Sequence, residues 1–469
     1  MVSALLASAK VLGVLKTIGG VALAIVILLA MITIHEFGHY IAGRLLGFKI
    51  NEFAVGFGPA ILKKRSKKTG VQFSLRVIPL GGYCAFDGED YDEEDERREK
   101  EKKQEKSEEI FEEYAESANA IPEGEKSDEI AENKENDGGV YESNDSATQK
   151  SSDVETDFSF DSKPSKDEYP EPKGKRFNDQ APWKRIIVLL AGATMNYLLA
   201  LTIIIMMFAC IGRPVYQVQE MAPPAETTDQ TAIESYNEGL QTGDVILKIE
   251  GKTVYMITDF VDELNGKKKG ETVDFLVLRD GKKQTVKVEL LENANFKNMS
   301  DTGTLLFSLG IATRTQAPNE KGETVWKTTR GGGLSPDYTK DGFFETIGNS
   351  FMYSFKIGGS ILRSIGELIT GKMPITNMGG PVTTIKVTSQ AASSGLASFL
   401  NIAAFIGVNL AVFNLLPVPA LDGCKIIFCL FEWIFKKRIN RKAELIINLV
   451  GIVFLFGFAI LVDVLQFIL

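Results

Sequence analysis

The sequence predicts a polytopic α-helical membrane protein with an inserted, strand-rich soluble domain. Three observations predict this class. Four segments are rich enough in Leu, Ile, Val, Phe and Ala to cross a bilayer, which takes about 20 apolar residues. Between the second and third segments, short runs alternate apolar and polar residues, as half-buried strands do. Between the first and second lies a long stretch that is almost wholly polar.

The four apolar segments divide the chain into spans and loops. The first segment has no basic start and no small-residue cleavage site, so we interpret it as a retained span and not as a signal peptide. The predicted transmembrane helices cover residues 18–48, 186–212, 395–423 and 445–469.

Clusters of Lys and Arg predict the orientation of these spans. One cluster follows the first span, one precedes the second, and one fills the loop between the third and fourth. Four spans place all three clusters on one side of the membrane. That side should be the cytoplasm, because short cytoplasmic loops carry an excess of basic residues. The long segment between the second and third spans is then outside the cytoplasm.

Residues 88–175 form an acidic insertion on the predicted cytoplasmic side. Asp and Glu far outnumber Lys and Arg there, although the whole chain has a net charge of only −9, so the rest of the chain is net basic. Such a composition cannot bury enough apolar surface to offset the entropy lost on ordering. We therefore predict a disordered, solvated insertion; a regulatory docking segment is the alternative.

Residues 213–318 should form the strand-rich domain. Val245, Leu247 and Ile249 lie on one face of a predicted strand, and Asp280-Gly281 is a hairpin signal. Residues 319–394 then form a linker. Within it, an apolar, glycine-dotted stretch over 343–369 is interrupted by charged residues, which predicts an amphipathic helix on the outer membrane surface.

The motif that carries chemistry lies in the first span. The chain has two histidines, and both belong to His35-Glu36-Phe37-Gly38-His39. Positions i and i+4 share one face of a helix, so both imidazoles can reach one tetrahedral metal ion. Glu36 sits beside the first ligand, where a carboxylate can act as a base toward water. The alternative is a polar helix end at the interface, but ionisable groups inside spans are costly and usually functional.

A catalytic zinc site needs a third protein ligand, and no histidine is left to supply it. The four cysteines are irregularly spaced and form no Cys-x-x-Cys pair, which argues against a zinc ribbon or a disulfide framework. A thiolate or a carboxylate must therefore complete the site. The best candidate is Asp422, in the sequence NLLPVPALDG at 414–423. Two prolines and a glycine break the helix there, and broken backbone at membrane depth is tolerated where it lines a cavity.

At these motifs the sequence resembles the site-2 proteases, and within them the bacterial regulator of sigma-E protease group. The resemblance rests on HEFGH at 35–39 and NLLPVPALDG at 414–423. MGGPV at 378–382, ahead of the third span, and PLGGY at 79–83, after the first, add to it. The resemblance covers nearly all of the chain except the acidic insertion.

The resemblance implies an intramembrane zinc metalloprotease. It implies that Zn²⁺ is bound by His35, His39 and Asp422, and that Glu36 activates water. It further implies that two asparagines of the third span hold the substrate chain near the metal, namely Asn409 and Asn414.

The resemblance also implies the nature of two segments. Residues 49–87 should form a membrane-associated β-hairpin that enters the bilayer from the cytoplasmic side, where its edge can pair with an unwound substrate strand. Residues 213–318 should form a PDZ-like domain outside the cytoplasm. That domain either binds peptide or acts as a steric filter.

Three positions depart from the family pattern. Cys424 stands where a second glycine usually follows Asp-Gly, which either restricts the local backbone or adds a thiol near the zinc. Ala193 replaces a usual proline on the second span, while Asn196 remains without an assigned role. The stretch 221–236, where a PDZ peptide groove would begin, is longer and more polar than expected.

The expected function is regulated intramembrane proteolysis in the bacterial plasma membrane, with the active site toward the cytoplasm. Expected partners are the lipid bilayer and single-pass transmembrane substrates, such as an anti-sigma factor or a signal-peptide remnant. An upstream site-1 type protease would trim them first, and no nucleic acid is expected to bind. The alternative function is a non-catalytic scaffold that binds clients through its PDZ-like domain. Intact Glu36 and Asp422 argue against a scaffold. A metal transporter should carry acids or histidines on several spans, and apart from Asp463 the other spans lack them.

Overall fold

The computed structural model describes residues 2–89, 169–219, 221, 232–233, 239–298, 301–318, 324–331, 333–437 and 439–468. Most of the predicted acidic insertion lies outside the described residues. Four of the described helices are long and apolar enough to cross a membrane: α1 (Val2–Leu46), α3 (Pro182–Cys210), α8 (Leu396–Asn414) and α10 (Arg441–Ile468). The protein is a multi-pass membrane protein.

The helix bounds differ from the predicted spans in informative ways. α1 begins at Val2, well before residue 18. α3 begins at Pro182, which suits the first turn because the proline lacks an N–H that this turn would leave unpaired. The predicted third span is interrupted: α8 ends at Asn414 and α9 (Asp422–Phe435) starts eight residues on. The prolines in between cannot continue a helix.

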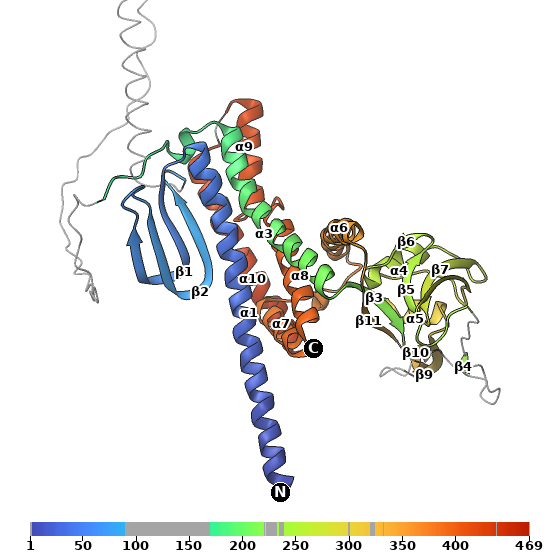
Figure 1. The fold of residues 1–469 in the computed structure, drawn as a ribbon. Coiled ribbons are helices and arrows are strands. Elements are labelled where there is room, and N and C mark those ends of the chain that lie inside the picture. Colours follow the sequence, from blue (N-terminus) through green and yellow to red (C-terminus); the bar gives the residue numbers. More distant parts are fainter. Residues whose placement is uncertain are drawn as a thin grey trace, which may run out of the picture.

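α3 is the central helix of the bundle. It packs against α1, α8 and α9. A Cβ added to Gly407 on α8 would lie 2.9 Å from the Cβ of Ala200 on α3, so small residues allow these two helices to approach closely. α7 (Pro381–Ser394) follows the short 3₁₀ helix η2 (Ile375–Asn377) and packs against α1 and α8. Figure 1 shows α3 running between α1 and the C-terminal helices.

A two-stranded antiparallel sheet lies beside α1 (Figure 1). It comprises β1 (Ile50–Arg65) and β2 (Gln72–Phe86), within the residues predicted to form the hairpin. Both strands bend, so the first part of β1 pairs twice: Phe53 lies opposite both Phe73 and Cys84. The end of β2 therefore returns along the first part of β1. This return brings residues 82–86 next to α1.

Both ends of the acidic insertion meet at one point. Asp87 lies 2.6 Å from Nζ of Lys49 and accepts a hydrogen bond of 3.0 Å from Nε of Arg176. Burial opposes the charge on Asp87, but the two cations outweigh it and hold the pKa of Asp87 below its usual value. Three phenylalanine rings contact one another next to these residues in edge-to-face and tilted pairs: Phe48, Phe86 and Phe177, the last of which begins the 3₁₀ helix η1 (Phe177–Asp179). The residues on either side of the insertion, 87–89 and 176, are therefore held together at the end of the sheet, and we call them the root of the insertion.

The strand-rich domain is built on a six-stranded sheet (Figure 1). Its path runs β11-β3-β5-β7-β8, and β6 pairs with β5. The bounds are β3 (Arg213–Val218), β5 (Val245–Ile249), β6 (Lys252–Thr253), β7 (Thr272–Arg279), β8 (Lys282–Glu289) and β11 (Leu334–Thr339). A smaller sheet contains β4 (Ala232–Ile233), β9 (Ala312–Pro318) and β10 (Thr324–Gly331). Two short helices complete the domain, α4 (Ile257–Leu264) and α5 (Thr302–Ser308).

This domain extends beyond its predicted end at residue 318. β11 pairs with β3 over six residues, so the sheet uses a segment that was predicted to be linker. The strand carries a proline and polar residues, and Pro336 is tolerated because β11 is an edge strand. Its sequence therefore lacks the alternation by which strands are recognised.

α6 (Phe343–Ile369) connects the strand-rich domain to the membrane helices (Figure 1). Its residues coincide with the predicted amphipathic helix. On one side Tyr353 donates a hydrogen bond of 2.6 Å to Asn401 of α8, and on the other Lys356 pairs with Asp259 of α4 at 2.5 Å. Phe343 and Phe344 at its start are 73% and 85% exposed, which suits contact with lipid.

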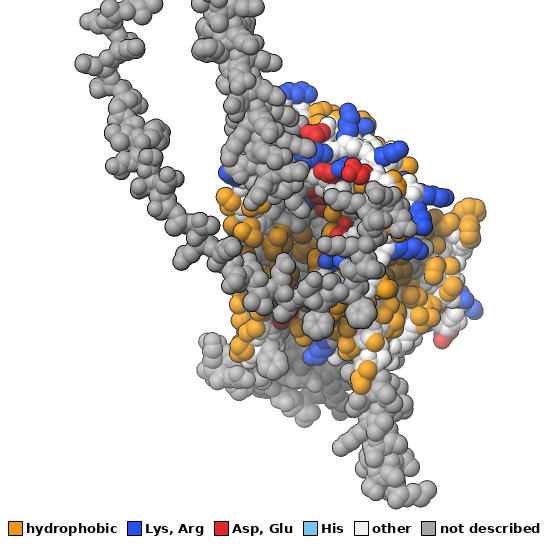
Figure 2. Space-filling model, turned by 90° about the vertical axis from the view of Figure 1, so that its left-hand side faces the viewer, with side chains coloured by type: hydrophobic (Ala, Val, Ile, Leu, Met, Phe, Trp, Pro, Cys, Tyr) orange, Lys and Arg blue, Asp and Glu red, His pale blue; other side chains and the backbone are white. Residues whose placement is uncertain are grey.

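The face that carries the two-stranded sheet is amphipathic. Figure 2 shows hydrophobic side chains on the lower part of this face and Lys and Arg side chains above them. Ile61, Leu62 and Val77 of the sheet are each more than half exposed. Exposed aliphatic side chains in such number are costly in water and favourable in lipid.

Candidate metal centre

His35 and His39 lie on one face of α1, in its last part. The two rings are four residues apart, and their Nε2 atoms face each other at 3.1 Å. Both side chains are buried, with 8% and 7% of their surfaces exposed. The spacing of four residues predicts that the two imidazoles lie close together, and in the structure they do.

Asp422 comes from the other end of the chain. α8 ends at Asn414, the segment with the two prolines interrupts the helix, and α9 begins at Asp422. Ala420 in this segment has a φ of 75°, a strained conformation for a residue with a Cβ. The break places Oδ2 of Asp422 3.1 Å from Nε2 of His35 and 3.3 Å from Nε2 of His39.

The three side chains fit a tetrahedral metal ion. Ligand atoms at about 2.0–2.1 Å from such an ion lie about 3.3–3.4 Å from one another. The separations of 3.1–3.3 Å between the two Nε2 atoms and Oδ2 come close to this value. Oδ2 is also buried with no hydrogen-bond donor among the described residues. Within the described part of the chain, these residues form the one His, Cys, Asp or Glu cluster with metal-ligand spacing.

Glu36 stands beside this cluster without belonging to it. Its carboxylate is half-buried and makes no hydrogen bond or ion pair with the described residues. A Cβ added to Gly82 would lie 3.3 Å from Cγ of Glu36, so the end of β2 runs directly past the side chain. A free carboxylate next to a metal site can accept a proton from water.

The two predicted substrate-binding asparagines occupy different positions. Nδ2 of Asn414 lies 3.3 Å from Nδ1 of His35, so this side chain is part of the site. Asn409 is half-buried on α8, and its Oδ1 is buried with no hydrogen-bond partner among the described residues. Cys424 is buried two residues after Asp422, but the described metal cluster does not include it.

α3 contributes residues that the sequence did not assign to the site. Nδ1 of His39 lies 2.8 Å from the carbonyl oxygen of Val188. A Cβ added to Gly192 would come within 2.4 Å of Nε2 of His39, so only glycine leaves room for the ring. The sequence shows that Val188 and Gly192 are four residues apart and so share a face of α3. It does not show that this face contacts His39, because that depends on how α3 packs on α1.

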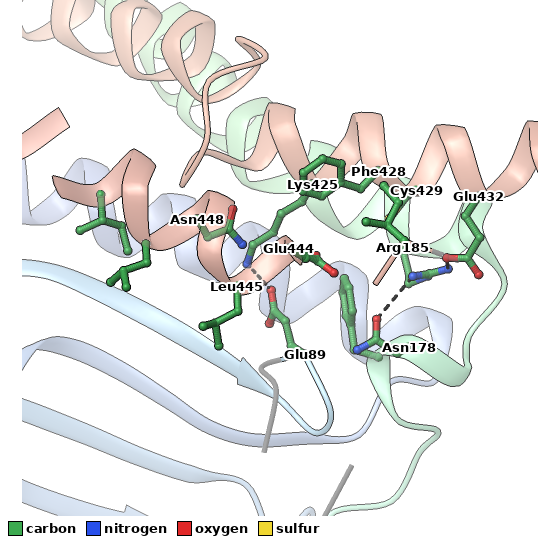
Figure 3. A pocket seen from close by; sticks show the side chains of 14 residues that line it. Glu89, Asn178, Arg185, Lys425, Phe428, Cys429, Glu432, Glu444, Leu445 and Asn448 are labelled. Carbon is green, nitrogen blue, oxygen red and sulfur yellow. Dashed lines mark hydrogen bonds and ion pairs between the residues drawn. The ribbon is translucent and has the colours of Figure 1, made fainter. Parts of the chain in front are cut away.

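A cavity lies next to the metal cluster, where α9 continues from Asp422 to Lys425 (Figure 3). It has a volume of about 320 Å³ and lies between α3, α9, α10 and Glu89. Two ion pairs line it, Lys425 with Glu89 at 2.7 Å and Arg185 with Glu432 at 2.5 Å. Because α9 carries both Asp422 and Lys425, the root of the acidic insertion is tied to the helix that brings the candidate ligand.

Two imidazoles and a carboxylate converge beside a glutamate within a bundle of apolar helices, which is the arrangement of a membrane-embedded metallopeptidase. The chain belongs to peptidase family M50, whose model matches residues 23–458. This membership confirms the resemblance to the site-2 proteases.

Two relatives match over almost their full length. The regulator of sigma-W protease RasP of Bacillus subtilis is 28% identical over 92% of this chain and 94% of its own. The zinc metalloprotease RasP of Bacillus licheniformis is 29% identical over 91% and 93%. Among solved structures, the PDZ domain of the SdrC-like protein from Listeria monocytogenes is 19% identical, with a TM-score of 0.13, over 25% of this chain and 85% of that domain.

Proposed function

We propose that this chain is an intramembrane zinc metalloprotease that hydrolyses peptide bonds within or near transmembrane segments. One observation carries the proposal: His35, His39 and Asp422 converge at the break between α8 and α9, inside a bundle of membrane helices. Relatives that are named zinc metalloproteases support zinc as the metal.

The roles of the site residues follow from their positions. His35, His39 and Asp422 would hold the ion. When bound, zinc acidifies water and polarises a peptide carbonyl. Glu36 takes the proton from the attacking water and later passes it to the leaving amine. Its carboxylate is available for this because no described residue pairs with it.

The substrate must present an extended backbone to this site. A transmembrane helix keeps its carbonyls in its own hydrogen bonds, so it has to unwind before attack. Residues 82–86 pair with the first part of β1 on one side, and within the described sheet their other side has no strand. This free edge passes Glu36 at Gly82, where it can pair with an unwound substrate by strand addition. Asn414, and Asn409 on the same helix, would hold the chain there.

The strand-rich domain would lie outside the cytoplasm and control which proteins reach the site. The basic clusters favour a cytoplasmic position for the sheet, for the root of the insertion and for the end of α9. The PDZ-like domain is then on the opposite side, held by α6 at the membrane surface. A folded domain in that position favours substrates that an upstream protease has already trimmed. The bilayer is the bacterial plasma membrane in this account.

The position of the cleaved bond tests this function. The purified full chain is reconstituted in liposomes with a single-span peptide that carries a helix-breaking pair in its apolar segment, and products are mapped by mass. We expect cleavage inside or at the border of the apolar segment, because the ligands lie within the helix bundle. Cleavage confined to the polar tails would contradict an intramembrane site. Peptide binding without hydrolysis, by protein that carries one zinc per chain, would favour the scaffold.

A further inference from the structure

One face of α3 lies against the two histidines. Val188, Gly192 and Asn196 are spaced by four residues, so they form one stripe along the helix. Val188 and Asn196 are 0% and 1% exposed. A Cβ added to Gly192 would lie 2.4 Å from Nε2 of His39 and 2.7 Å from Cε1 of His35. The stripe therefore contacts both imidazoles.

The first residue of the stripe fixes the tautomer of His39. A carbonyl oxygen can only accept a hydrogen bond, and that of Val188 lies 2.8 Å from Nδ1 of His39. Nδ1 must then carry the ring proton, which leaves the lone pair of Nε2 free for a cation. Outer acceptors of this kind orient metal-binding histidines and select the binding tautomer.

His35 needs an equivalent acceptor at its own Nδ1. Its Nε2 faces Asp422 and His39, so Nε2 is the atom that would bind the ion. Nδ2 of Asn196 lies 3.4 Å from Nδ1, while Oδ1 of Asn196 is buried with no hydrogen-bond partner among the described residues. The two orientations of a carboxamide differ by a half-turn about the Cβ–Cγ bond. The half-turn directs Oδ1 toward Nδ1–H and gives the buried oxygen a donor.

We propose that Asn196 is a positioning residue that holds His35 as the Nδ1–H tautomer through its Oδ1. α3 thereby supplies both outer acceptors of the site, the carbonyl of Val188 for one histidine and the amide of Asn196 for the other. Asn414 also approaches His35, but its Nδ2 lies 3.3 Å from Nδ1 and 3.4 Å from Nε2, so it is not directed at Nδ1 in particular. Asn196 contacts Nδ1 and not Nε2. The inference rests on the proposed metal site and adds a residue that the site needs for affinity.

The tautomer can be observed directly because the chain contains two histidines. Histidine labelled with ¹⁵N in the zinc-loaded full chain gives signals from these two residues only. We expect both to carry the proton on Nδ1 and to bind through Nε2. We further expect the Nδ1 signal of His35 to shift in Asn196→Asp, with little change for His39. A proton on Nε2 of His35 overturns the proposal, whether or not any variant folds.

Zinc affinity, measured by competition with a chromophoric chelator, provides the second readout. Asn196→Leu keeps the size and removes the acceptor, so its Kd for zinc should rise by about 10–100-fold. Asn196→Asp keeps an acceptor and should remain within about tenfold of the wild type. Asn401→Leu, on α8 at the hydrogen bond with Tyr353, is the matched control and should bind zinc normally.

The outcomes separate this inference from the proposed function. Wild-type protein that binds no zinc would remove the metal site and with it both conclusions. If the wild type binds zinc, a folded Asn196→Leu variant with unchanged affinity overturns only the role of Asn196. An Asp variant that loses as much affinity as the Leu variant also overturns it, because packing and not the acceptor would then be responsible. A loss in Asn414→Leu with none in Asn196→Leu would transfer the role to Asn414.

Discussion

Replacing Glu36 with Gln should lower kcat for peptide cleavage by about 10²–10⁴-fold, the range that a positioned general base contributes. Gln keeps the size of the side chain and removes its ability to take a proton. Zinc content per chain should stay at the wild-type value, because Glu36 is not part of the ligand cluster. Cleavage of a transmembrane peptide and metal analysis of the same preparation check both parts.

A second glutamate provides the control for this substitution. Glu345, in the first turn of α6, accepts a hydrogen bond from the backbone of Gly342 and lies on the helix that carries the strand-rich domain. Glu345→Gln should cleave at nearly the wild-type rate. Cleavage by Glu36→Gln at a rate close to that of wild type would remove Glu36 from the role of base.

Replacing Asp422 with Asn should release most of the zinc. The substitution removes the only carboxylate of the described cluster and its negative charge, while the two imidazoles remain. Loss of an outer partner already costs about 10–100-fold in metal affinity, so loss of a direct anionic ligand should cost more than about 100-fold. Competition with a zinc chelator measures the affinity, and the cleavage rate should fall in proportion to the zinc lost.

Asp463 is the matched control for Asp422. It lies on α10 and accepts hydrogen bonds from the backbone of Val382 and Thr383, so it caps the start of α7 and not the metal site. Asp463→Asn should keep its zinc, although α7 would be less firmly held. Zinc affinity unchanged in Asp422→Asn would show that another group completes the site.

The sequence predicted the site as far as it depends on local spacing. His35 and His39 share a helix face by their separation alone, and Asp422 follows a helix break that proline dictates. Asn196 and Gly192 contact the histidines because α3 packs on α1, and no local sequence pattern indicates which face of one span contacts another. From the sequence, Asn196 could be named as a residue of the second span but could not be given a role.

The fold was predicted to a similar depth. The length of the apolar segments identified the four membrane helices. α6 has the predicted bounds, which follow from an apolar stretch interrupted by charged residues. β11 was missed because an edge strand can carry proline and polar residues. The meeting of Asp87 with Arg176 was also beyond prediction, since it joins residues on either side of a long polar insertion.

Removal and return of zinc is the most direct test of a metal-dependent protease within the membrane. The wild-type chain in liposomes is assayed with a transmembrane peptide before chelation, after chelation, and after one equivalent of zinc per chain is restored. The account predicts that cleavage disappears with the zinc and returns with it, at the same bond within the apolar segment. Undiminished cleavage by protein shown to contain no zinc would contradict it.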